Sequence, residues 1–142
     1  MTLEVVTLGL KRPLEVEVTR ITAPFWSGLA DGKFLLAQCS TCARQSFPPR
    51  QICPKCHSRD FEWVEASGEA SVYSFTRIHN TPTRYNLLNP SVVAIIDLIE
   101  GVRLLTRMLT NENPVVVGGR CRLVITSHPD GEHYAAVALP AN

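Results

Sequence analysis

The spacing of four cysteines constrains the fold of this chain more than any other feature. Cys39 and Cys42 form one C-x-x-C pair, ten residues follow, and Cys53 and Cys56 form a second pair. Two residues between cysteines let the chain turn so that both sulfurs reach one metal ion about 2.3 Å away. Two such pairs at this separation predict a tetrahedral Cys₄ zinc site, with one tight turn at each end of a small zinc ribbon.

The zinc is expected to be structural, because the four cysteines fill the coordination sphere and imply no open position. Two disulfides or free thiols are the alternatives for these residues, whereas a redox C-x-x-C would not need a second copy. The fifth cysteine, Cys121, lies between Arg120 and Arg122 in a strand-like run. We expect it to be a buried small apolar residue rather than a reactive thiol.

Composition and charge restrict the class of protein. The chain has 142 residues, enough for one compact core or for a small metal module beside a small domain. Its net charge of +1 argues against nucleic-acid binding, because proteins that neutralise many phosphates usually carry a strong basic excess. No apolar run approaches the roughly 18 residues of a membrane span, and no signal-peptide pattern is seen. Together with metal-spaced cysteines, this predicts a cytoplasmic protein.

Residues 1–35 are predicted to form an N-terminal arm and a short docking helix. Residues 14–19 alternate apolar and polar side chains, which predicts a half-buried strand, and residues 3–6 are a candidate hairpin partner for it. Thr22 is a candidate N-cap for a helix of about two turns that ends near Gly32. This aromatic helix is either a lid packed on the ribbon or an exposed docking surface.

The rest of the chain reads as β structure in two parts. The ribbon is assigned to residues 36–67, with short strands near 34–38, 45–47 and 61–64. From residue 68 to 142, turn glycines separate five strand-like runs. These runs lie at 70–76, 92–98, 102–109, 120–125 and 134–139. They predict a small closed or partly open barrel, with the apolar run 92–98 buried on both faces.

The ribbon residues resemble a known family. Cys39 to Cys56, with Phe47-Pro48-Pro49-Arg50 between the pairs, resembles the prokaryotic zinc-ribbon plus OB-fold family that partners thiolase-like acyl-CoA enzymes. The likeness continues through residues 68–76, at residues 100–103 and at Gly118-Gly119. It implies a mainly β protein with a rubredoxin-like Cys₄ ribbon and a five-stranded OB-fold at 68–142. Ala43 departs from the family, since many members have Gly there.

The resemblance implies a non-catalytic accessory subunit of a thiolase-like acyl-CoA acyltransferase or lyase. Such a subunit stabilises its thiolase partner in a hetero-oligomer and helps to form the site for the coenzyme A thioester. Arg77 and Arg84 are candidate contacts to coenzyme A phosphates, because a guanidinium fork matches phosphate oxygens. The alternative for both is an ordinary solvated loop.

Two other functions are weighed against this one. The first is a nucleic-acid-binding module, in which Tyr73 and Phe75 would act as stacking platforms. The second is a small independent enzyme that uses His79, His128 or His133, although histidines in loops are usually only solvated. No nucleophile and base are spaced as a recognisable catalytic set, so no catalytic residue is assigned.

Overall fold

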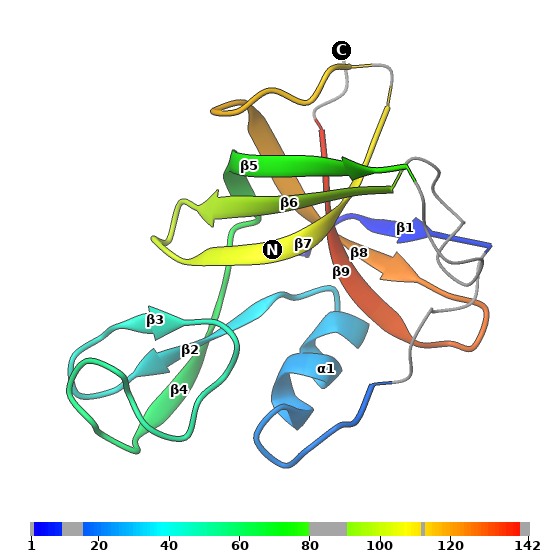
Figure 1. Cartoon of the computed structure of the whole chain (residues 1–142). Helices are drawn as coiled ribbons and strands as arrows, with labels where there is room; N and C mark the ends of the chain where they lie inside the picture. The colour runs from blue at the N-terminus through cyan, green and yellow to red at the C-terminus, as the bar shows by residue number, and fades with distance from the viewer. Residues whose placement is uncertain (1, 10–15, 80–90, 112, 140–142) are drawn as a thin grey trace.

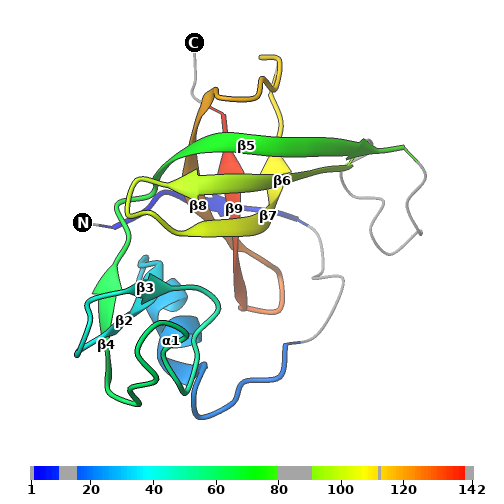
Figure 2. The same ribbon diagram turned by 60° about the vertical axis from the view of Figure 1, so that its left-hand side comes forward.

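The computed structural model describes residues 2–9, 16–79, 91–111 and 113–139 (Figure 1). One helix and nine strands are found there, and the strands form two sheets. The ribbon and the helix lie side by side beneath a β-barrel in Figures 1 and 2. The mainly β architecture predicted from the sequence is therefore confirmed.

The smaller sheet is the zinc ribbon. Its strands β2 (Leu35–Cys39), β3 (Gln45–Ser46) and β4 (Phe61–Glu65) pair antiparallel in the order β3-β2-β4. Cys39 is the last residue of β2, and Cys42, Cys53 and Cys56 lie in the segments between the strands. The ribbon strands predicted from the sequence are confirmed within one or two residues.

The larger sheet closes into a barrel of five strands. Their order is β8-β5-β6-β7-β9, and β9 pairs back onto β8. All pairs are antiparallel except β7 with β9. The strands are β5 (Glu69–Ile78), β6 (Ser91–Leu98), β7 (Arg103–Leu109), β8 (Arg120–Ser127) and β9 (His133–Ala138). This closed five-stranded barrel is the predicted OB-fold.

Burial of β6 differs from the prediction. Val92, Ala94, Ile96 and Leu98 point into the core, whereas residues 93, 95 and 97 are only partly buried. The outer face of β6 lies in the middle of a single sheet layer, so neighbouring strands shelter it without a second layer on top. The prediction of full burial on both faces was wrong.

The N-terminal arm adds a strand to the barrel. Strand β1 (Val5–Thr7) pairs parallel with residues 125–127 of β8, and residues 16–19 are not a strand. The hairpin between 3–6 and 14–19 was therefore wrong, although residues 14 and 15 lie outside the described residues. Strand β5 pairs only with residues 120–122 of β8, so the rest of that edge has backbone groups to satisfy, and β1 satisfies them.

Helix α1 (Ala23–Ala30) joins the ribbon to the barrel core. Thr22 is its N-cap residue, but the Thr22 side chain bonds to Thr19 instead of to the helix. Phe25 is 5% exposed and packs against two ribbon rings, Phe34 and Phe47, at centroid distances of 5.1 and 5.3 Å. Trp26 contacts Tyr134 of β9 at 5.9 Å. The helix is thus a lid packed inside the molecule, and its Phe25 is not available for docking.

Candidate metal centre and binding surfaces

The two cysteine turns have matching backbone geometry. The amide of Ala43 donates to the Cys39 carbonyl, and the amide of His57 donates to the Cys53 carbonyl, each at 2.9 Å. Ala43 and His57 both have a positive φ, of 63° and 64°. Each turn closes on itself in this way and holds both of its sulfurs on one side.

The four thiols converge on one point. Their Sγ atoms all lie within 4.8 Å of one another, with 3.5 Å between Cys39 and Cys56 and 3.6 Å between Cys42 and Cys53. A tetrahedral zinc with bonds of about 2.3 Å places its sulfurs about 3.8 Å apart. The donor set and the distances fit zinc. They support a structural zinc, because four protein ligands complete its coordination.

The pKa values explain why this cluster needs a cation. Backbone N–H groups, that of Cys42 first, lower the pKa of Cys39 to about 6, and those of Cys56 and Lys55 lower the pKa of Cys53. The Ser58 amide acts in the same direction on Cys56, but burial and the three neighbouring sulfurs raise the Cys56 pKa to about 12. Four thiolates this close repel one another, and a divalent metal removes that cost.

Cys121 is separate from this cluster. It is 5% exposed in the barrel core, and burial raises the pKa of its thiol to about 11. It is the small buried residue that the sequence predicted, and its neutral thiol is a poor nucleophile.

The outer surface of β5, β6 and β7 carries a set of neighbouring apolar and charged side chains that are exposed or only partly buried. We call Tyr73, Ile95, Asp97, Arg103 and Leu105 the outer face. The Arg103 guanidinium lies 3.5 Å from the Tyr73 ring centroid and bonds to Asp97 at 2.6 Å, which lowers the Asp97 pKa. Leu105 is 67% exposed beside its cross-strand partner Ile95. The outer face is an apolar strip with one anchored cation.

Tyr73 and Phe75 do not form the stacking surface considered in the sequence analysis. A register shift between Val72 and Ser74 turns Tyr73 outward, where it is 50% exposed, while Phe75 packs against the core. Arg103 covers the ring of Tyr73. Tyr73 and Phe75 are two residues apart and would face the same side of a regular strand. They face opposite sides here because the β-bulge inserts one extra residue into β5. The sequence carries no signal for this bulge.

The remaining candidate residues do not form one site. Arg77 is exposed near the end of β5, and Arg84 lies outside the described residues, so their contact with coenzyme A stays a prediction. His79 is exposed, but His128 is 7% exposed and bonds to Thr126 at 3.0 Å, so the expectation of a solvated histidine was wrong there. His133 begins β9. Within the described ranges, the four cysteines are the one cluster of metal-type donors.

Comparison with known proteins agrees with this architecture. Residues 26–62 match the family described as ChsH2, rubredoxin-like zinc ribbon domain, and residues 63–126 match ChsH2, C-terminal OB-fold domain. The domain limits predicted from the sequence, 35/36 and 67/68, stay a prediction. Among the described segments, no helix is long and apolar enough to span a membrane.

Two curated relatives and one solved structure are similar to the chain. A DUF35 domain-containing scaffold protein of Methanocaldococcus jannaschii is 40% identical over 68 residues, 47% of this chain and 48% of the relative. A probable enoyl-CoA hydratase alpha subunit of Thermomonospora curvata is 38% identical over 86 residues, 60% of this chain and 27% of the relative. The chain thus spans half or less of these relatives.

The solved structure is titled Ltp2-ChsH2(DUF35) aldolase. The match has a TM-score of 0.79 and 25% identity, and it covers 88% of this chain and 98% of the other.

Proposed function

The chain belongs to the ChsH2 family, whose members join a rubredoxin-like zinc ribbon to an OB-fold, and from this membership we propose that it is a non-catalytic accessory subunit of an acyl-CoA enzyme. The partner we propose is a thiolase-like acyltransferase or lyase. In this role the chain stabilises the partner and helps to form its site for the coenzyme A thioester. The partner supplies the nucleophile and the base.

One observation carries the proposal. The chain resembles a protein from a structure titled as an Ltp2-ChsH2(DUF35) aldolase over nearly its whole length, with the ribbon and the barrel both included. Fold alone does not fix function, but here the matched protein is one component of a named enzyme assembly. The hydratase alpha subunit from Thermomonospora adds a second relative named for work on a coenzyme A ester.

The distribution of residues supports a non-catalytic role. Among the described residues, the four ribbon cysteines are the only group that could hold a metal ion, and a tetrahedral zinc bound by all four has no coordination position left for substrate. Cys121 is buried and protonated, so it does not provide a thiolate nucleophile. Arg77 is exposed on β5 and has no ion-pair or side-chain hydrogen-bond partner among the described residues, which suits a contact to a phosphate of coenzyme A.

The outer face is the surface we assign to the partner. Helix α1 has buried Phe25 and Leu29 internally, so it presents no aromatic pair for docking. The outer face instead exposes Leu105 and Tyr73, at 67% and 50%, around the fixed guanidinium of Arg103. Exposed apolar groups with an anchored arginine and tyrosine are typical of the centres of protein interfaces.

Affinity capture tests this assignment. The tagged chain is used as bait in native lysate, and captured proteins are identified by mass and assayed for thiolytic cleavage of acyl-CoA. We expect a stoichiometric thiolase-sized partner that is lost with Leu105→Lys and retained with Val18→Lys, a matched change at another exposed apolar residue. If both variants lose the captured partner, or if neither does, the outer face is rejected as the docking surface, but the proposal of a partner enzyme still stands. Recovery of the bait without any acyl-CoA enzyme would reject the proposed function itself.

The nucleic-acid alternative has less support. The net charge is +1, Tyr73 is covered by Arg103, and Phe75 packs inward. A protein that binds single strands by stacking needs open aromatic faces along a basic groove.

A further inference from the structure

A small cavity lies on the outside of the barrel where β7, β9 and β8 meet the arm. Its volume is about 180 Å³. Four apolar side chains line it: Leu8, Leu109, Ala135 and Ala136. An apolar cavity of about 150 Å³ is large enough to hold one benzene molecule. The cavity therefore fits a compact hydrocarbon group of about that size.

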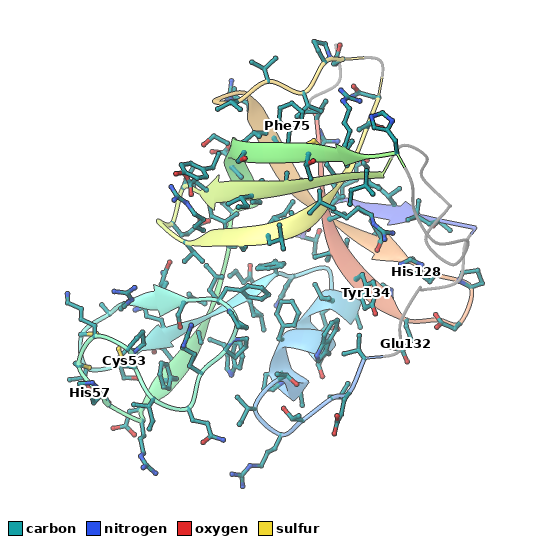
Figure 3. The ribbon with its side chains drawn as sticks, viewed as in Figure 1. Cys53, His57, Phe75, His128, Glu132 and Tyr134 are labelled. Carbon is teal, nitrogen blue, oxygen red and sulfur yellow. The ribbon has the colours of Figure 1, made fainter. Side chains whose placement is uncertain are left out.

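One side of the cavity is polar and rigid. Thr126 and His128 are 3% and 7% exposed, and the Thr126 hydroxyl lies 3.0 Å from His128 Nε2. Tyr134 meets the His128 ring edge-on at 5.7 Å, and Figure 3 shows both residues together on the β8–β9 hairpin. These side chains are held in place by one another, so the polar wall is preorganised.

The remaining lining residue is Arg107. Its side chain is half-buried at the cavity, and it makes no ion pair or side-chain hydrogen bond with any residue that the structure describes. Arg103, four residues earlier on the same strand, by contrast forms an ion pair with Asp97. A guanidinium carries five N–H donors in a planar fork that matches a carboxylate, so Arg107 has an unused anion-binding group beside an apolar space.

We propose that this cavity binds a small monocarboxylate with an aromatic or branched hydrocarbon body. The carboxylate bonds to Arg107 at the cavity rim, next to the polar wall of Thr126 and His128. The hydrocarbon body occupies the space among Leu8, Leu109 and the two alanines. The site is built entirely from this chain and does not depend on the proposed acyl-CoA partner.

Titration of the whole protein with benzoate tests the site, with amide chemical shifts as the readout and benzyl alcohol as the uncharged analogue. We expect benzoate to shift amides in 124–128 and 134–137, and benzyl alcohol to bind at least about tenfold more weakly, because it lacks the charge-assisted pair. Arg107→Gln should weaken benzoate binding by about tenfold or more, whereas Arg103→Gln should leave it unchanged. If the glutamine variant does not fold, Arg107→Lys is used instead. It should lose less affinity than Arg107→Gln because lysine keeps the positive charge, but it should still lose some because lysine lacks the planar guanidinium fork.

Three results would overturn the proposal. The first is that these amides are shifted neither by benzoate nor by isovalerate, which is tested as the branched-chain monocarboxylate. The second is that the shifts cluster on another surface. The third is that Arg107 and Arg103 variants lose the same affinity, since a nonspecific charge effect would then explain the binding.

Discussion

Ala43 and His57 occupy equivalent positions in the two cysteine turns, and both have left-handed backbone conformations, with φ of 63° and 64°. Each follows the second cysteine of its pair and donates its amide to the carbonyl of the first. The turn requires this geometry whichever residue is present. Neither residue is a glycine, so both positions carry backbone strain.

Replacing Ala43 with glycine should stabilise the zinc-loaded protein by roughly 0.5 kcal/mol. Relief of the left-handed strain is worth about 1–2 kcal/mol, and the greater freedom of glycine in the unfolded chain takes back part of it. Denaturant unfolding monitored by tryptophan fluorescence measures the change. Ala30→Gly is the matched control, since Ala30 is an exposed helical residue with negative φ. The control should lose stability, by at most about 1 kcal/mol because Ala30 is the last helical residue, and an equal loss at Ala43 would contradict the strain argument.

Removing one zinc ligand should unfold the ribbon. Cys56→Ser is expected to abolish stoichiometric zinc binding, and exposure of the Phe34–Phe47 contact should follow, because metal binding supplies the folding free energy of such modules. Zinc content by elemental analysis and near-UV circular dichroism measure both effects. Cys121→Ala, which removes a thiol far from the metal, should keep its full zinc content.

Cys121 should make stability fall at high pH. Burial raises the pKa of its thiol to about 11, above the unfolded value, so the folded chain holds a proton that the unfolded chain has released. Its contribution is complete below the unfolded pKa and is lost as pH rises towards 11. Unfolding free energies between pH 8 and pH 11 should fall less steeply in Cys121→Ala than in the parent protein. Identical slopes in the two proteins would show that burial does not raise the pKa of the Cys121 thiol.

The Thr126–His128 hydrogen bond should stabilise the β8–β9 hairpin. Thr126→Val leaves buried His128 without this partner and should cost about 1–3 kcal/mol. Thr76→Val, on an exposed site of β5, should change stability by less than about 0.5 kcal/mol. Thermal unfolding of the two variants compares them directly, and equal losses would remove the buried bond as the cause.

The sequence predicted the features that local patterns encode. The cysteine spacing located the metal ligands, and the alternation of apolar residues located the five barrel strands to within a few residues. The short helix at Ala23–Ala30 followed from Pro24 and Gly32. In each case the signal lies within a few neighbouring residues, so no knowledge of distant contacts was needed.

The missed features depend on contacts between distant segments. Strand β1 pairs with residues 125–127, which lie 120 residues later in the chain (Val5 with Ile125), and nothing near Val5 indicates that partner. His128 is followed by a Pro-Asp-Gly turn that suggested exposure, yet the hairpin folds it against Thr126 and Tyr134. Arg107 resembles any strand arginine until the cavity beside it is seen.

The most direct test of the central claim is an add-back assay. The complex captured from native lysate is assayed for thiolytic acyl-CoA cleavage, stripped of this chain, and assayed again before and after purified chain is returned. The accessory-subunit account predicts that activity is lost on stripping and restored by the zinc-loaded chain, and that the chain alone has none. Full activity in the stripped partner would contradict it.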